Sequence, residues 1–421
     1  MPEFRSPPGT HDVLPPESAR WQELVARFAA IVGRAGYGLV VSPAFEDVGV
    51  FQRVGEGTDV VRKEMYDFED KGGRHLALRP EGTAPVVRAW VQHRPPVPFK
   101  AWYAAPNFRY EHAQAGRYRQ HHQLGVEVLG TEDPDLDVEV VALAWSVITD
   151  LGLRRVELVL NSLGDSVCRP GYLDALRQFL DERRDQLCDE HRDRVAENPL
   201  RVLDCKREAC RAATADAPHM VDHLCEPCRA HFARVRVGLD TLGVPWRLEP
   251  RLVRGLDYYT RTAFELVAGA LETAQNGVGG GGRYDRLAED LGGPPTPGIG
   301  FGIGIERLLL TCDAEGVFPA PSGTVEVFVI DTTGGLEALQ FSAELRAAGV
   351  RSDRAFDRRS MKAQFRAADR SGAALVAIIG ERERVNGTVT LQDLDYGRQE
   401  IVSREKAVER AKERLKERVL A

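Results

Sequence analysis

Residues 100–130 read KAWYAAPNFRYEHAQAGRYRQHHQLGVEVLG, and this stretch decides the fold class. Its two halves, 100–111 and 120–130, are both strand-like, and a short polar loop joins them. Consecutive strands joined by a short loop pair in antiparallel fashion. A second hairpin is expected at 64–80, around the turn KGG. The first part of the chain is therefore predicted to contain a largely antiparallel sheet.

Other segments surround this sheet with helices. Apolar residues at helical spacing predict a helix with Ser18 as its N-cap and an end at Gly36. The strand-like segment that follows contains Pro43, which places it at a sheet edge or a strand end. Further elements are expected at 81–93 and about 134–150 as helices, and at 156–162 as a strand.

The chain of 421 residues is long enough for two or three domains. Residues from about 165 to 245 predict a helical insertion, and the glycine-rich segments 276–293 and 297–310 are interpreted as turns that lead into helices. The sequence FPAPSG marks a linker, after which strands and helices alternate. We expect an α+β catalytic domain over 1–320 and a C-terminal α/β domain with a mostly parallel sheet over 324–421.

Composition limits the cellular setting and the classes of partner. No apolar run is long enough to span a bilayer, and the N-terminus lacks the apolar region of a secretory signal, so we expect a cytoplasmic protein. The seven cysteines agree with a reducing compartment. The net charge of −7 leaves room for local nucleic-acid contacts, and basic clusters lie at 116–120, 357–370 and 412–418. For any single cluster, a solvated helix or loop face is the favoured interpretation.

Several charged and polar residues stand where strands end. Arg109 follows a strand, where a guanidinium group can bind a carboxylate or a phosphate, or form a surface salt bridge. Glu81 precedes a helix, so it can receive an ammonium group or interact with the helix N-terminus. Gln123, Gly125 and Glu127 share one face of a strand, and a buried glutamate needs a partner.

The motif of a P-loop is missing, so a P-loop nucleotide site is not expected. Gly302 and Gly304 leave one strand face bare for a flat ring, which Arg307 would cover through a cation–π contact. A tight joint between strand and helix is the alternative. The stretch RGLDYYTRTAFE, which begins at Arg254, is either a turn before a strand or the floor of a pocket for an anion.

Four cysteines lie in the predicted insertion, with the spacing C-x4-C and C-x2-C. They are Cys205, Cys210, Cys225 and Cys228, and His219, His223 and His231 are further possible ligands. They either bind a structural zinc ion or serve as small buried apolar residues, and the sequence leaves both open. No metal is assigned to any residue at this stage.

Together these motifs resemble the histidyl-tRNA synthetases, a family of class II aminoacyl-tRNA synthetases, over nearly the whole chain. GYGLVVSPAFEDVGVF, NFRYEHAQAGRYRQHHQLGVEVLG and GIGFGIGIERLLL are similar to the three class II motifs. RGLDYY together with RPEGT is the specific part of the resemblance. The resemblance implies activation of L-histidine with ATP and Mg²⁺, transfer to tRNA(His), a homodimer, and an anticodon-binding C-terminal domain.

The resemblance also implies roles for individual residues. Arg254 and Arg109 would be catalytic, beside the α-phosphate of ATP. The histidine-binding residues would be Glu81, Thr83, Gln123, Glu127, Tyr258, Tyr259 and Tyr284. The ATP-binding residues would be Arg109, His121 and Arg307, with His121 where the family often has phenylalanine. The candidates for contact with the tRNA acceptor end are Gln114, Arg117 and Arg119.

A competing hypothesis is a synthetase-like regulatory subunit, a paralogue that assists the first enzyme of histidine biosynthesis. Such proteins lack the terminal domain and usually have an altered RGLDYY motif, whereas this chain contains both. A plain nucleotide-binding protein would leave Arg254, Glu127 and Gln123 unexplained as a set.

Overall fold

A computed structural model describes residues 4–55, 58, 60–112, 116–193, 195–196, 198–256, 258–271, 276–321 and 325–420. The chain divides into two compact units. The first contains Met1–Asp12 and Glu23–Pro319, and the second contains Val13–Gln22 and Ala320–Ala421. Each unit has a large sheet of its own.

The first unit is built on an eight-stranded sheet, with strand order β1-β5-β6-β11-β10-β9-β7-β8. Its central strands are antiparallel, and only the short edge strands β1 and β8 pair in parallel with their neighbours. The predicted hairpin is confirmed as β5 and β6, which confirms the antiparallel class. The strands are β1 (Gly38–Leu39), β5 (Phe99–Phe108), β6 (Gln120–Leu129), β7 (Val156–Ser162), β8 (Arg247–Leu248), β9 (Thr260–Ala268), β10 (Gly277–Arg283) and β11 (Gly298–Gly304).

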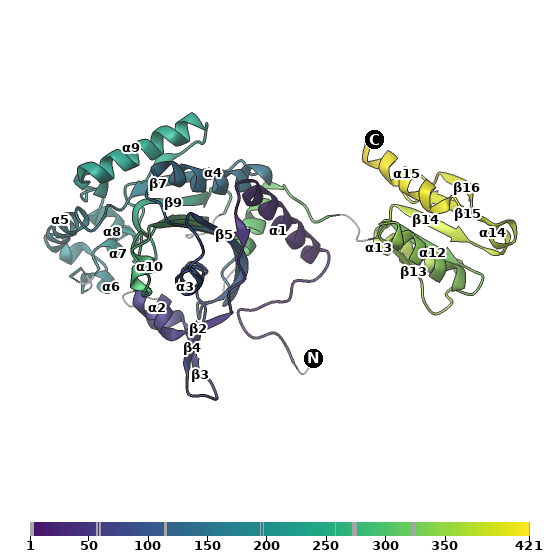
Figure 1. Ribbon diagram of the computed structural model, residues 1–421, viewed down its shortest axis with the longest axis horizontal. Helices are drawn as coiled ribbons and strands as arrows, with labels where there is room; N and C mark the ends of the chain where they lie inside the picture. Colours follow the sequence, from purple (N-terminus) through teal and green to yellow (C-terminus); the bar gives the residue numbers. More distant parts are fainter. Residues whose placement is uncertain are drawn as a thin grey trace. The chain divides into compact units, whose positions relative to one another are not determined.

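One face of this sheet is a closed apolar layer. Phe301 on β11 contacts Phe264 on β9 and Phe28 on α1 (Glu17–Arg34), with ring centroids 6.4 and 6.2 Å apart. Helix α4 (Pro134–Asp150) also packs on β10 and β11, and α9 (Glu226–Thr241) packs on α4 and β9 (Figure 1). Because aromatic and aliphatic side chains fill this face, only the opposite face is open for ligands.

A small antiparallel sheet and short helices border the open face. The predicted hairpin around KGG is confirmed as β3 (Tyr66–Glu69) and β4 (His75–Leu78), and β2 (Phe45–Asp47) pairs with β4. Helices α2 (Val48–Gly55), α3 (Thr83–His93) and α10 (Leu287–Asp290) pack together beside it. Pro43 lies between β1 and β2, in agreement with its predicted place at a strand end.

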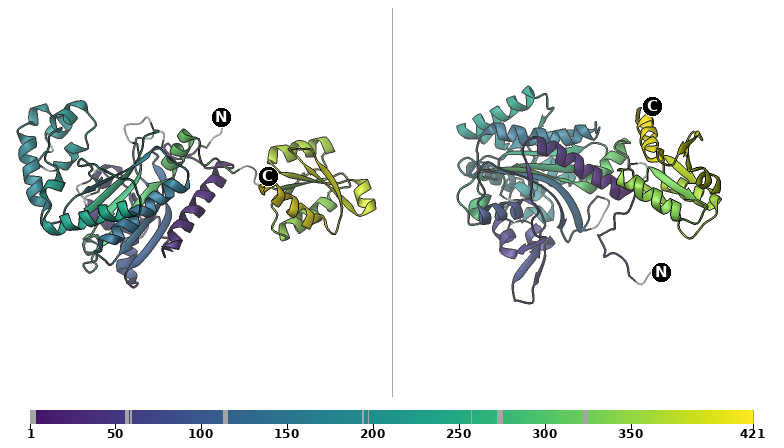
Figure 2. Two further views of the ribbon diagram at one scale, coloured as in Figure 1. Left: turned by 90° about the horizontal axis from the view of Figure 1, so that it is seen from above. Right: turned by 45° about the vertical axis from the view of Figure 1, so that its right-hand side comes forward.

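The helical insertion contains one long helix, one medium helix and several short ones. Its α-helices are α5 (Arg169–Asp181), α6 (Asp189–Arg192), α7 (Leu200–Leu203), α8 (Glu208–Ala213) and α9. Short 3₁₀ turns lie at Arg184–Gln186 and Met220–His223. In the left view of Figure 2 the short helices form a group at one end of the first unit, and the turn Met220–His223 contacts β7. The insertion therefore reaches one end of the open face.

Two local predictions were wrong. Helix α1 begins at Glu17, so Ser18 lies inside its first turn and is not the N-cap. The segment beginning at Gly277 is a strand, β10, and not a turn. Glycine is unfavourable in a strand by itself, but β10 is paired on both sides, with β9 and β11, and this backbone pairing outweighs the local preference.

The second unit is an α/β sandwich around a five-stranded sheet, with order β13-β12-β14-β15-β16. The predicted parallel pairing is present among β12, β13 and β14, but β15 and β16 pair antiparallel, so the sheet is mixed. A short hairpin connection between β15 and β16 permits only antiparallel pairing. The strands are β12 (Val327–Asp331), β13 (Ser352–Arg354), β14 (Leu375–Ile379), β15 (Thr388–Asp393) and β16 (Gln399–Ser403).

Helices cover both faces of this second sheet. Helices α12 (Leu336–Ala347) and α15 (Ala407–Leu420) share one apolar cluster with alternate residues of β12 and β14, and α13 (Met361–Ser371) covers the other face. The remaining α-helices are α11 (Ile305–Glu315) in the first unit and α14 (Glu381–Asn386) here, and a short π-helix lies at Val60–Glu64 in the first unit. Among the described helices of the chain, none combines the length and apolar character needed to cross a membrane.

Candidate active site

The open face of the large sheet is a floor built mostly of peptide groups. Gln123, Gly125 and Glu127 of β6 face the same side, as the period of two predicted, and they stand opposite Gly304, Gly302 and Gly300 of β11 in register. Beyond β11, β10 contributes further glycines, and Gly302 pairs with Gly280. This arrangement leaves a bare strip between the polar side chains of β6 and those of β9.

At two of these positions only glycine fits, because neighbouring atoms lie too close for a Cβ atom. A Cβ atom at Gly300 would overlap the carboxylate of Glu127. A Cβ atom at Gly280 would lie 2.8 Å from a guanidinium nitrogen of Arg254 and 2.6 Å from the carbonyl oxygen of Phe264. Any side chain at these positions would displace a charged group of the site, which explains why residues without side chains line the floor.

A cavity of about 840 Å³ lies over the bare strip. Arg109, Arg254 and Arg307 all line it, although they come from the end of β5, the loop before β9 and the first turn of α11. Arg109 donates from Nε to the carbonyl of Pro80 at 2.8 Å, and Arg307 donates to the carbonyls of Gly116 and Gly277 at 3.0 and 2.8 Å. These bonds to backbone hold the guanidinium groups of Arg109 and Arg307 in place, and the carboxylate of Glu111 lies 3.8 Å from Arg109.

The electrostatics of this cavity favour an anionic ligand. Burial lowers the pKa of Arg109 and Arg307 from the ordinary value, because a desolvated cation is less stable. The nearest carboxylate to Arg254 is Glu265, at 4.0 Å. Within the described part of the chain, the buried Nε of Arg254 has no hydrogen-bond partner. A ligand carrying phosphate or carboxylate oxygens would satisfy these groups.

The carboxyl group of Glu127 is enclosed by the side chains of Thr83, Tyr103 and Tyr284, and these four buried residues are called the Glu127 compartment below. The Glu127 carboxylate accepts hydrogen bonds from Thr83 Oγ1 at 2.7 Å, from Tyr284 Oη at 2.5 Å and from Tyr103 Oη at 3.4 Å. Burial raises the pKa of Glu127 to about 8, although the hydrogen bonds from Tyr284 and Thr83 act in the opposite direction. A buried carboxyl group of this kind binds a ligand that brings its own N–H donor.

Tyrosine side chains form the wall between the two compartments. The rings of Tyr258 and Tyr259 are 4.7 Å apart, and Tyr258 meets Tyr284 edge-on at 6.0 Å. The guanidinium of Arg254 lies 5.2 Å from the centre of the Tyr259 ring. Arg254, Tyr258 and Tyr259 therefore connect the buried carboxyl compartment to the arginine-lined cavity, in agreement with the interpretation of that stretch as the floor of a pocket.

The contacts of Glu81 match the alternative interpretation of that residue. Its carboxylate accepts the backbone N–H groups of Thr83 and Ala84 at 2.6 and 2.7 Å, and thus caps helix α3. Burial raises the pKa of Glu81 from the ordinary value. Each carboxylate oxygen has two acceptor positions, so this capping leaves room for a further donor from a ligand.

Two further residues of β6 lie beside the cavity. Gln123 accepts a hydrogen bond from the amide of Asn107 at 2.7 Å, which fixes its side chain over the floor. His121 also lines the cavity, and burial together with nearby Arg109 lowers its pKa to about 3. The ring of His121 is therefore neutral near pH 7, as a stacking surface requires.

Comparison with known proteins identifies the family to which this chain belongs. The family described as Histidyl-tRNA synthetase matches residues 9–308. The chain belongs to the histidyl-tRNA synthetase family. A second family, described as Anticodon binding domain, matches residues 325–414, which lie in the second unit.

Individual members of the histidyl-tRNA synthetase family cover almost the whole chain. A histidine–tRNA ligase of Rhodococcus erythropolis is 49% identical over 413 residues, which is 97% of both proteins. That of Anaeromyxobacter dehalogenans is 50% identical over 391 residues, covering 92% of this chain and 94% of the relative. The apo crystal structure of the S. aureus histidyl-tRNA synthetase superposes with a TM-score of 0.82 at 35% identity, over 97% of this chain and 100% of that one.

The three candidate tRNA contacts of this family member are not equivalent. Arg117 lines the cavity and is paired with Glu111. Arg119 lies away from the cavity lining, because its guanidinium stacks over the ring of Tyr110 at 4.0 Å and bonds to the carbonyl of Glu111. Gln114 lies outside the described residues.

Sequence reasoning missed two members of the site, Tyr103 and Asn107. Both lie on β5, directly opposite Gly125 and His121 of β6. Tyr103 packs against Gly125 and bonds Glu127, while Asn107 orients Gln123. The signal was available, because residues at alternate positions of the predicted hairpin share a face, and the polar face of β6 implied a polar face on β5.

The cysteines of the insertion do not form the single group that their sequence suggested. Cys205 and Cys210 lie with Cys188 and His191, while Cys225 and Cys228 lie with Asp165 and Cys168. The three histidines considered as ligands belong to neither group. His231 bonds Asp137 at 2.8 Å, His219 is near Asp222, and His223 packs on Tyr172.

Proposed function

We propose that this chain is a histidine–tRNA ligase, which activates L-histidine with ATP and transfers it to the 3′ end of tRNA(His). The observation that carries the proposal is the buried Glu127 compartment, which adjoins a cavity lined by Arg109, Arg254 and Arg307. One compartment suits an imidazole, and the other suits the phosphates of ATP. The family membership supports the same reaction.

Histidine recognition rests on the buried carboxyl and the tyrosine wall. Glu127 accepts an N–H of the imidazole, and the hydroxyl of Tyr259 pairs with the other ring nitrogen. Tyr258 and Tyr284 enclose the ring. An amino acid without a ring N–H donor would leave the buried polar groups of the site without hydrogen-bond partners. Because unpaired buried polar groups cost binding free energy, these residues reject such amino acids. Glu81, Thr83 and Gln123 receive the α-ammonium group; their backbone and amide partners already hold them in place.

The first chemical step joins two anions. The histidine carboxylate attacks the α-phosphorus of ATP, forms the mixed anhydride histidyl-adenylate and releases pyrophosphate. The attacking group is already ionised, so the step needs no general base. Arg254 and Arg109 lower the electrostatic barrier, because they stand at fixed positions in the same cavity. Arg307 covers the adenine from one side, and His121 contacts it as a neutral ring.

Mg²⁺ would accompany the ATP phosphates in this reaction. The carboxylates of Glu265 and Glu306 line the same cavity as the three arginines, and carboxylate oxygens are ligands that Mg²⁺ accepts. When bound, the ion supplies positive charge to the phosphate oxygens.

Transfer to tRNA uses both units of the chain. Arg117 at the cavity, with Gln114 and Arg119 in the same segment, would contact the acceptor end, whose terminal ribose hydroxyl attacks the anhydride. The second unit would bind the anticodon, in agreement with its family match. Arg358, Arg359 and Lys362, at and before the start of α13, are exposed and suited to grip the RNA backbone.

We further propose that the chain acts as a homodimer in the cytoplasm. Leu39, Val41 and Phe45, in and beside the edge strands β1 and β2, are each at least half exposed. Exposed apolar side chains at a sheet edge suit burial against a second copy. Sedimentation analysis of the chain and of a Val41→Asp variant tests this, and a monomeric wild-type chain would disprove it.

Histidine-dependent exchange between ATP and pyrophosphate tests the catalytic proposal. The full chain should exchange labelled pyrophosphate into ATP with L-histidine, and not with L-glutamine or L-phenylalanine, and it should charge tRNA(His). A regulatory subunit would show neither activity. Absence of exchange by a folded, full-length chain would refute the assignment.

A further inference from the structure

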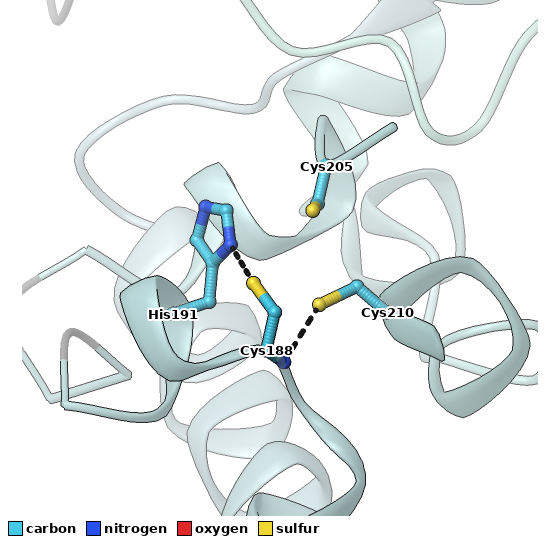
Figure 3. A group of neighbouring side chains, drawn as sticks. All are labelled: Cys188, His191, Cys205 and Cys210. Atoms are coloured by element: carbon cyan, nitrogen blue, oxygen red, sulfur yellow. Dashed lines mark hydrogen bonds between the residues drawn. The ribbon is translucent and has the colours of Figure 1, made fainter. Parts of the chain in front are cut away.

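Four side chains whose donor atoms could bind a metal ion meet in the insertion. Cys188 precedes α6, His191 lies within it, Cys205 follows α7, and Cys210 lies in α8 (Figure 3). One donor atom from each residue lies within 4.8 Å of all the others. The seven cysteines of the chain are free thiols. Two short chain segments thus bring three thiols and one imidazole to a common point.

The spacing of these donors matches a tetrahedral ion. Zinc–sulfur bonds of about 2.3 Å and zinc–nitrogen bonds of about 2.0 Å place neighbouring donors roughly 3.5–3.8 Å apart. Cys188 Sγ and His191 Nδ1 are 3.1 Å apart, so small rotations of the side chains bring the donors to this spacing. The two ligand pairs, C-x2-H and C-x4-C, each come from a short local segment, as in structural zinc sites.

The surroundings also suit thiolate ligands. The backbone N–H of Cys188 donates to Sγ of Cys210 at 3.2 Å, and such bonds orient and stabilise a metal-bound sulfur. Cys205 and Cys210 are buried, while Cys188 and His191 are half-buried, so an ion can reach the group from one side.

We propose that Cys188, His191, Cys205 and Cys210 bind one Zn²⁺ ion, which holds the short helices of the insertion together. Helices α6, α7 and α8 have four, four and six residues, too few to be stable alone. Small units with little regular structure commonly depend on a metal or a disulfide. This inference concerns the insertion alone and does not rest on the proposed catalytic function.

The ion would also fix one wall of the cavity. Leu203, Cys205 and Arg211 line it, so a ligand of the metal is itself part of the wall. Arg251 ties the same segment to the loop before Arg254, because it donates to the carbonyls of Leu203 and Thr214 at 3.1 and 2.7 Å. Metal binding at Cys205 therefore positions the insertion against the loop that leads to Arg254.

The second cysteine group differs in one respect that matters. The Oδ1 atom of Asp165 already accepts the backbone N–H groups of Val167 and Cys168 at 2.9 and 3.2 Å, just before α5. Asp165 therefore stabilises the turn before α5. This role explains why Asp165 lies beside Cys168, Cys225 and Cys228 even when no ion is bound. The proposal is limited to the group of Cys188, and the second group serves as its internal control.

Metal analysis of the full chain, purified without chelator and without a metal-affinity tag, tests the proposal. We expect Cys205→Ser and His191→Ala to lower the zinc content by one ion per chain relative to the wild type, and Cys225→Ser to retain that ion. His191 is half-buried, so its variant should fold even where Cys205→Ser does not. Addition of Co²⁺ to the metal-free protein should give the charge-transfer absorption of cobalt–thiolate bonds, which the two site variants lose.

Proteolysis provides a second measurement on the wild-type chain. Removal of the ion with a chelator should expose the segment 188–210 to cleavage, and added Zn²⁺ should restore its protection. A wild-type chain that binds no zinc after exposure to excess ion would overturn the proposal, as would full zinc content in both site variants.

Discussion

Replacement of Glu127 by glutamine should remove a loss of unfolding free energy that the wild type shows as the pH rises, while it lowers the activity. The pKa of Glu127 is raised to about 8 in the folded chain, from an ordinary value of 4.5, chiefly by burial. Between these two values the folded state binds more protons than the unfolded state. The unfolding free energy of the wild type therefore falls as the pH rises through this window.

The size of the effect follows from the pKa difference. One pKa unit corresponds to about 1.4 kcal/mol, and integration from pH 5 to pH 8 gives a loss of about 3 kcal/mol attributable to this carboxyl. Glutamine has nearly the same shape and cannot ionise. The Glu127→Gln variant should thus gain about 3 kcal/mol relative to the wild type over the same pH range.

The activity should change in the opposite direction. Bound histidine places an imidazole N–H against Glu127 and so favours the ionised form of this carboxyl group. A hydrogen bond to a charged group contributes about 1.5–3 kcal/mol, so kcat/KM for histidine in pyrophosphate exchange should fall roughly 10- to 100-fold. Urea unfolding of the ligand-free chain at pH 5, 6, 7 and 8 measures the first effect, and exchange kinetics measure the second. Glu157→Gln, at an exposed position of β7, is the matched control and should change neither.

Parallel pH profiles for Glu127→Gln and the wild type would refute this reasoning. They would mean that Glu127 ionises normally in the folded protein and that its compartment is wetter than the contacts indicate. An unchanged kcat/KM for histidine would separately remove Glu127 from substrate recognition.

Three further predictions concern the same site. Arg254→Ala should reduce kcat for pyrophosphate exchange roughly 10²- to 10³-fold, because the cation acts where two anions approach, and an unchanged rate would exclude that role. Tyr284→Phe removes the 2.5 Å hydrogen bond to Glu127 and should lower kcat/KM for histidine about 10-fold, with KM for ATP unchanged; a selective effect on ATP would contradict the assignment. His121 has a pKa of about 3, so KM for ATP should show no titration of this residue between pH 5.5 and 8, and His121→Phe should keep KM within about 3-fold; a titration that His121→Phe abolishes would show that the ring is charged.

The sequence predicts those parts of the fold that depend on local alternation. The hairpin of β5 and β6 and the shared face of Gln123, Gly125 and Glu127 follow from the period of two. The strand β10 could not be predicted this way, because its stability comes from pairing with β9 and β11, which are distant in sequence. Local preference for a turn in a run of glycines was the wrong guide there.

For the candidate site too, some features could be predicted from the sequence and others depend on the folded arrangement. Arg109, Arg254 and Arg307 line one cavity, as the motifs implied. The grouping of the cysteines failed, because nearness along the chain does not decide which short helices meet. Cys188 lies beside Cys205, although α6 and α7 separate them in the sequence. Cys225 lies beside Asp165, which is at the start of the insertion. Only the folded arrangement reveals the two sets.

The glycine floor has a consequence for inhibitors. A flat compound that lies against Gly300, Gly302 and Gly280 touches peptide groups, whose chemistry no point mutation alters. A side chain at Gly300 would overlap Glu127, and one at Gly280 would crowd Arg254 and the backbone, so mutations at these two positions damage the protein's own use of the site. A Cβ atom at Gly302 would meet only the Gln123 side chain, at 3.5 Å. Drug resistance should therefore arise at the rim, for example around Arg117, or at Gly302, and rarely at Gly280 or Gly300.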